Sequence, residues 1–252
     1  MKQTPLAISS ACDCIHKLDR LLITLAACLI LCNSSDADEP QRFYDPVKRN
    51  IEGWTVAVDP ELLSDENKSV GETCLSALAN HLQRIKFIVA PERVEQLQQL
   101  PIWIDWHHEL GNMQYHPDRG WLLANDHDPR LVKHVHIPRA VQLLDRSQWA
   151  KHPYVVLHEL AHAYHDQVLG FDHPAIRKTF DRMKVEGTYE KVLLYTGQHV
   201  RHYALSNHKE YFAESTEAYF GVNDFYPFVR AELKEHDPSM YKVMQTVWGE
   251  IR

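Results

Sequence analysis

The sequence predicts an α+β fold in which a small mixed sheet with helices is followed by a helical C-terminal half. Two features carry this prediction: β-type patterns are confined to the first half, and helical periodicity dominates the second. The strand-like runs are 54–58, 101–106 and 133–137. Between them, apolar residues recur at helical spacing in 71–86, and a proline opens a shorter helical run at 91–100.

The second half is helical in its patterning. One helix is predicted from about Pro153 to Leu169, because Gly170 then ends it. The other helical segments are 139–146, 174–186, 207–220, 227–236 and 238–250, and 189–195 is ambiguous. We therefore predict one folded domain at 51–252, preceded by a linker at 38–50.

The composition is that of a globular protein. A chain of 252 residues can bury a sizeable core, and its 44% apolar and 24% charged residues are ordinary values. The net charge of −7 argues against nucleic acid or an anionic membrane surface as a general partner. The 17 histidines are unusual in number, but most are scattered outside any ligand spacing, so nearly all are expected on the solvated surface.

Residues 1–37 are interpreted as a signal peptide or a lipoprotein leader. Lys17 and Arg20 precede an apolar stretch of 12 residues at 21–32, which is short for a membrane span of ~20 residues. We therefore expect a secreted or cell-envelope protein, with no membrane span in the mature chain.

Three outcomes are open for this leader. Small residues favour cleavage after Ala37, whereas the sequence Leu-Ala-Ala before Cys28 resembles a lipobox and would place a lipid anchor on that cysteine. An uncleaved anchor is the third alternative. Cleavage after Ala37 leaves Cys74 as the single cysteine of the mature chain, so no internal disulfide is expected.

The most informative motif is His158-Glu159-Leu160-Ala161-His162, an HExxH sequence in a predicted helix. Residues four apart lie on the same face of a helix, so both imidazoles can reach one metal ion. Glu159 lies between them, where its carboxylate can take a proton from a metal-bound water. The motif predicts a catalytic zinc site with His158 and His162 as two of the ligands.

A catalytic zinc ion requires a third protein ligand. The metzincin continuation HExxHxxGxxH is absent from this chain. A later segment, 203–221, carries Glu210, Glu214 and Glu217 at helical spacing among apolar and aromatic residues, which predicts that the helix is buried. Buried carboxylates need a cation or other partners, and a zinc ion meets that need.

HELAH at 158–162, Tyr203-x6-Glu210 and the following Tyr-Phe-Ala-Glu214 make the chain resemble a family, the gluzincin metallopeptidases of the anthrax lethal factor and Pro-Pro endopeptidase type. The match covers roughly residues 150–221. The resemblance implies that Glu210 is the third zinc ligand, with Glu214 as the alternative, and that Tyr203 assists catalysis. It also implies that Glu214, one turn beyond Glu210, orients a ligand histidine.

The expected fold is therefore a zincin-like metallopeptidase domain. In this layout the active helix lies under an edge strand that can hold an extended peptide. The expected function is a secreted or cell-envelope zinc endopeptidase with one Zn²⁺ per chain. Glu159 is the expected general base for the zinc-activated water, and the partner is a peptide or protein substrate. The alternative is a catalytically silent zinc-binding module of the same fold.

Overall fold

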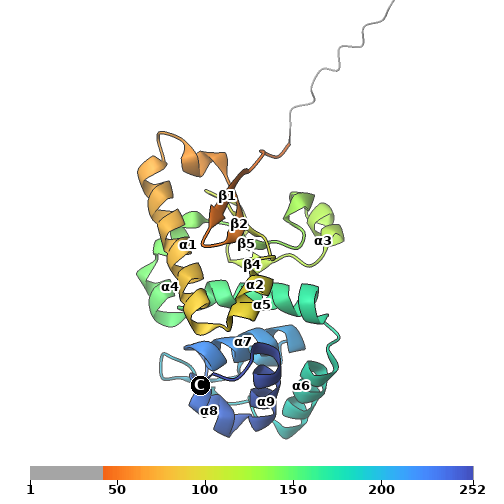
Figure 1. Ribbon diagram of the computed structural model, residues 1–252. Coiled ribbons are helices and arrows are strands. Elements are labelled where there is room, and N and C mark those ends of the chain that lie inside the picture. Colours follow the sequence, from red (N-terminus) through yellow and green to blue (C-terminus); the bar gives the residue numbers. More distant parts are fainter. Residues whose placement is uncertain (1–41, 252) are drawn as a thin grey trace, which may run out of the picture. The chain divides into compact units, whose positions relative to one another are not determined.

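A five-stranded mixed sheet forms the N-terminal part of the fold in the computed structural model, which describes residues 42–251 (Figure 1). The strand order is β1-β2-β3-β5-β4. The three inner strands are parallel, and each edge strand is antiparallel to its neighbour. The five strands are β1 (Val47–Ile51), β2 (Trp54–Val58), β3 (Ile102–Ile104), β4 (Gln114–Tyr115) and β5 (Val135–Ile137). A short hairpin elsewhere pairs β6 (Val192–Leu193) with β7 (His199–Val200).

Side chains alternate along the strands, so the sheet has two different faces. One face contributes six apolar side chains to the main core: Val56, Val58, Ile102, Ile104, Val135 and Ile137. The other face carries Ala57, Trp103 and His136, which are aligned across β2, β3 and β5. Leu122 and Leu131 pack with Ala57 and Trp103 in a second, smaller core.

Four helices and three 3-10 turns accompany the sheet. The helices are α1 (Lys68–Ile88), α2 (Pro91–Leu97), α3 (Arg119–Ala124) and α4 (Arg146–Lys151), and the turns are η1 (Pro60–Leu63), η2 (Pro129–Leu131) and η3 (Ala140–Leu144). Helix α1 buries Leu78, Leu82 and Ile85 in the main core. Gly71 permits its close approach to η1, because a Cβ at that position would lie 2.0 Å from the carbonyl oxygen of Leu62.

Helix α5 (Val155–Tyr164) lies between the sheet and the C-terminal helices (Figure 1), and every one of its residues is buried. A π-helical turn, η4 (His165–Leu169), extends it to Gly170, where a positive φ of 81° ends the helix. Helix α7 (His208–Phe220) packs along α5. The remaining elements are α6 (Pro174–Glu186), η5 (Tyr203–Leu205), α8 (Arg230–His236) and α9 (Pro238–Trp248).

The predicted α+β layout is confirmed, but the linker prediction of 38–50 is wrong at its C-terminal end. The described chain forms one compact unit from Arg42, and β1 begins at Val47. Glu52 and Gly53, both with positive φ, make the two-residue turn that folds β1 onto β2. The middle of β1 is polar and exposed, so its sequence lacks the apolar alternation of a half-buried strand.

Three helical predictions differ in detail. The segment 139–146 forms the 3-10 turn η3 and is followed by a separate helix, α4. The helix that carries the HExxH sequence, predicted over 153–169, is α-helical only to Tyr164. The ambiguous segment 189–195 contains β6.

The predictions for the leader fall outside the described residues, and this includes Cys28, Ala37 and the whole of 1–37. Within 42–251, none of the helices has the length and hydropathy of a membrane span. Cys74 is a buried free cysteine.

The expectation that nearly all histidines lie on the surface is wrong. Eight histidines of the described chain are buried: His81, His116, His127, His136, His158, His162, His165 and His202. Several are stacked among aromatic rings, as His81 is on Trp149 with ring centroids 4.0 Å apart. A neutral imidazole ring can pack in an apolar interior. Such a histidine need not show the spacing of a metal ligand in the sequence, so its burial was not predicted.

Acid should destabilise the fold through those buried histidines whose pKa is lowered by burial, such as His81. Burial lowers the pKa of His81 from 6.5 to about 4, so below pH 6.5 the unfolded chain binds more protons and stability falls with pH, down to about pH 4. In this interval the free energy of unfolding falls by about 1.4 kcal/mol per pH unit for each such histidine. We expect His81→Phe, which keeps the stacking on Trp149, to flatten the dependence of the unfolding free energy on pH between 6.5 and 4.

The measurement is urea denaturation of the wild type and of His81→Phe at several pH values in that interval. Exposed His199→Phe is the matched control and should leave the slope unchanged. An identical slope in the wild type and His81→Phe would contradict the prediction.

Candidate active site

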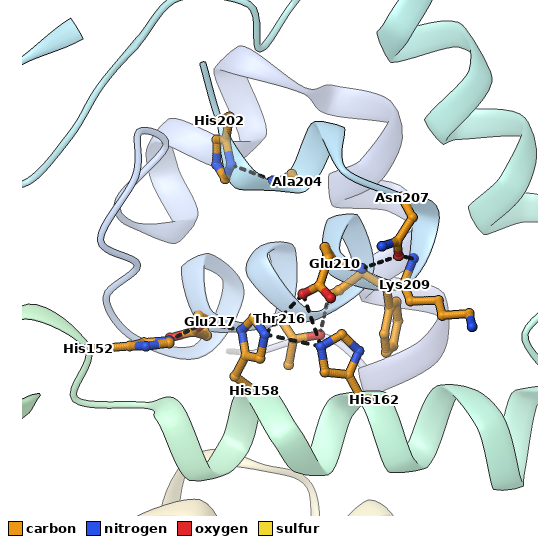
Figure 2. Close-up of polar contacts among 11 residues, drawn as sticks. His152, His158, His162, His202, Ala204, Asn207, Lys209, Glu210, Thr216 and Glu217 are labelled. Atoms are coloured by element: carbon orange, nitrogen blue, oxygen red, sulfur yellow. Dashed lines mark hydrogen bonds and ion pairs between the residues drawn. The ribbon is translucent and has the colours of Figure 1, made fainter. Parts of the chain in front are cut away.

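Helices α5 and α7 supply the candidate site and run antiparallel to one another (Figure 2). In α5, His158 and His162 lie one turn apart on the face that is turned toward α7. Asn207 begins α7, because its Oδ1 accepts hydrogen bonds from the backbone N–H groups of Lys209 (2.9 Å) and Glu210 (3.1 Å). This cap fixes Glu210 in the first turn, opposite the two histidines.

Three potential ligand atoms converge between the helices. Nε2 of His162 lies 3.1 Å from Nε2 of His158 and 3.1 Å from Oε2 of Glu210. Nε2 of His158 lies 3.4 Å from the same oxygen. Tetrahedral zinc with bonds of 2.0–2.1 Å separates its ligand atoms by about 3.3–3.4 Å. The donor types and the spacing of the three atoms therefore fit a zinc ion.

The orientation of the His158 ring suits it for ligation. Its Nδ1 lies 2.6 Å from Oε1 of Glu217, so Nδ1–H donates to that carboxylate and Nε2 faces His162 and Glu210. Nε2 of His152 lies 2.8 Å from the same carboxylate. Glu217 is fully buried and joins both rings (Figure 2). Burial raises the pKa of Glu217, but the two histidines outweigh it and lower the value to about 2.

The prediction that Glu214 orients a ligand histidine is not met by this geometry, since the hydrogen-bonded carboxylate belongs to Glu217. Nδ1 of His158 faces the N-terminal end of α5. Because α7 runs antiparallel to α5, the residue of α7 at that level is Glu217, two turns beyond Glu210. Glu214 lies between them and is 3% exposed. Its Oε2 has no hydrogen-bond partner within residues 42–251, and burial raises the pKa of Glu214 to about 8.

Glu159 and Tyr203 line one cavity with the three ligand atoms. The cavity volume is ≈ 560 Å³, and strand β4, α5, α7 and residues 224–225 form its walls. Glu159 is 8% exposed, and burial raises the pKa of its carboxyl group. Tyr203 begins η5 and is 49% exposed, and burial likewise raises its pKa.

Sequence reasoning missed two residues of this site. Glu217 had a visible signal, because it shares the helical stripe of Glu210 and Glu214. His152 lies outside the HExxH helix, and no local pattern connects it with Glu217, which is 65 residues away. Their contact depends on the packing of α5 against α7.

Negative charge is concentrated around the histidines. The carboxylates of Glu159, Glu210 and Glu217 are close enough to act on His158. Burial disfavours a charge on this ring, but Glu210 and Glu217 outweigh burial and raise the pKa of His158 well above 6.5. A cation bound to Nε2 would compensate the same carboxylates.

Comparisons with known proteins yield one structural similarity. No family model matches the chain, and no curated protein matches its sequence. The fold is similar to that of the Pro-Pro endopeptidase PPEP-2 from Paenibacillus alvei, with a TM-score of 0.41 and 18% sequence identity. The similarity covers 79% of this chain and 99% of the other. This similarity in fold does not assign the chain to a family.

The two buried glutamates should differ in their effect on metal affinity. Glu217→Gln removes the charge that orients His158, and such outer partners typically contribute 10–100-fold to affinity. We expect zinc affinity to fall by about that factor in Glu217→Gln and by less in Glu214→Gln. Competition with a chromophoric chelator measures both constants. A larger loss in Glu214→Gln would reassign the orienting role to Glu214.

Proposed function

We propose that the protein is a zinc-dependent endopeptidase. The observation that carries this proposal is the convergence of His158 Nε2, His162 Nε2 and Glu210 Oε2 within 3.4 Å, in a cavity that Glu159 also lines. Two imidazoles and one carboxylate form a ligand set of catalytic rather than structural zinc, because three protein ligands leave a position for water or substrate. Bound zinc would lower the pKa of a water and polarise the scissile carbonyl.

Glu159 is the proposed general base. Its carboxylate accepts a proton from the attacking water and delivers it to the leaving amine. Burial supports this role, because it raises the pKa of the carboxyl group toward the working pH and makes the proton easier to hold between the two steps.

Tyr203 is the proposed donor to the oxyanion. Its phenol lines the cavity beside Glu210 and stays protonated, because burial and the nearby Glu210 charge raise its pKa. A neutral phenol can donate a hydrogen bond to the oxygen on which charge develops. Its exposure of 49% allows the hydroxyl to reach a bound substrate.

An extended peptide is the proposed substrate, and strand β4 is its proposed docking edge. Gln114 and Tyr115 of β4 line the cavity, and this strand is one of the two edges of the sheet in the described chain. Tyr115 donates a 2.6 Å hydrogen bond to Asp166, which ties the strand to the turn after α5. A peptide could therefore add to this edge directly above the active helix.

The test is cleavage of a diverse peptide library by the zinc-loaded protein, read by mass spectrometry. We expect endoproteolytic products that disappear on chelation and return when zinc is restored. Absence of any cleavage, with zinc bound, would favour the catalytically silent binding module. We also propose a secreted or cell-envelope location, which fractionation of expressing cells would test.

Glu159→Gln should abolish hydrolysis and retain zinc. The amide cannot accept the proton, and loss of general base catalysis typically costs 10²–10⁴-fold in rate. The ligand atoms are unchanged, so zinc content by emission spectrometry should equal that of the wild type. Hydrolysis at the wild-type rate would refute the mechanism.

Tyr203→Phe should lower kcat by about 10²-fold with little change in KM, since it removes one donor that acts in the transition state. Zinc content should not change. The exposed Tyr195→Phe is a matched control, and its kinetics should resemble those of the wild type. Equal kinetics for Tyr203→Phe and the control would exclude an oxyanion role for Tyr203.

A further inference from the structure

A second group of metal-ligating side chains lies on the face of the sheet opposite the main core. Asp105 follows β3, His108 comes three residues later, and His136 lies on β5. One potential ligand atom from each of the three lies within 4.8 Å of the others. None of them lines the cavity between α5 and α7. The alternation of β5 separates the groups, because Val135 and Ile137 enter the main core and His136 does not.

Two members of this second group, Asp105 and His136, are buried and are ordered by an outer layer of hydrogen bonds. Asp105 is 2% and His136 0% exposed. Oδ1 of Asp105 accepts from Trp103 Nε1 (2.8 Å) and from the Tyr44 hydroxyl, which leaves Oδ2 beside Nε2 of His136 at 2.8 Å. Partners that orient a carboxylate and a ring in this way are typical of metal sites.

We propose that Asp105, His108 and His136 form a second metal site that binds a first-row transition cation such as Zn²⁺. Two imidazole nitrogens and one carboxylate oxygen favour zinc over Ca²⁺ or Mg²⁺, which prefer all-oxygen sites. His108 is half-buried and gives access from solvent.

Ion binding would replace the hydrogen bond between His136 and Asp105 and reverse the one between His136 and His116. Ligation through Nε2 moves the proton of His136 to Nδ1, which then donates to Nε2 of His116, now 3.0 Å away, while the His116 proton moves to its other nitrogen. No net proton is gained or lost. Ligation of His108 through Nε2 would move the proton of this ring to Nδ1, so the 3.2 Å hydrogen bond that Nδ1 accepts from the Leu110 N–H would be lost.

The experiment starts from a chain in which His158→Ala and His162→Ala remove the first group. After dialysis against zinc-free buffer, zinc titration by calorimetry and zinc content by emission spectrometry should give about one ion per chain, together with a raised Tm. Adding His108→Ala should abolish this binding. The exposed neighbour His107→Ala should retain it.

Circular dichroism checks that each variant folds, and Asp105→Asn replaces His108→Ala if the latter does not. Absence of zinc binding in the His158→Ala/His162→Ala chain would overturn the proposal. Equal binding by the His107→Ala and His108→Ala chains would also overturn it, because the ion would then lie on other surface groups. Neither result depends on hydrolysis, so this proposal and the peptidase proposal can fail separately.

Discussion

The geometry of the helix pair depends on one buried carboxylate, that of Glu217. A carboxylate without exposure in a largely buried helix is costly unless hydrogen bonds and opposite charge compensate it. Here both imidazoles that compensate it come from outside α7, one from α5 and one from the segment before α5. The same bonds therefore fix the approach of α7 to α5 and the ring orientation of His158. The Glu217 carboxylate therefore helps to position the potential ligand atoms, although it contacts only the opposite nitrogen of the His158 ring.

Close packing at the far end of α7 holds the same arrangement. Gly221 ends this helix against Tyr154, the residue before α5, and a Cβ there would lie 2.0 Å from the Tyr154 ring. The chain thus joins the two helices by a polar contact in the middle and by a backbone-to-ring contact at the end. Both contacts link segments that are at least 59 residues apart in the sequence.

Local signals were sufficient for much of the fold and for part of the site. The HExxH spacing places His158 and His162 on one helix face, and Pro174 and Gly187 bound α6 as proline and glycine usually do. Glu210 was assigned through a family resemblance, and the structure brings it to the two histidines. Glu214 and Glu217 share a stripe on one helix, so only the antiparallel packing against α5 decides which of them meets His158.

Non-local features account for most of the remaining differences. The five histidines His108, His116, His127, His134 and His136 are irregularly spaced in the sequence, and the turns around β4 and β5 gather them on one side of the sheet. Strand β1 was missed because its middle residues are polar, and β4 because it contains only two residues.

The polar strand β1 has a consequence for how the protein meets other chains. Lys48 and Arg49 are exposed on this edge strand. The backbone N–H and C=O groups of an edge strand can pair with a strand of another molecule, and charged side chains oppose such pairing. When two copies of the protein approach through their β1 edges, repulsion between these positive charges opposes dimerisation. The two borders of the sheet are therefore unequal, because positively charged side chains project from β1, whereas β4 lines the cavity beside α5.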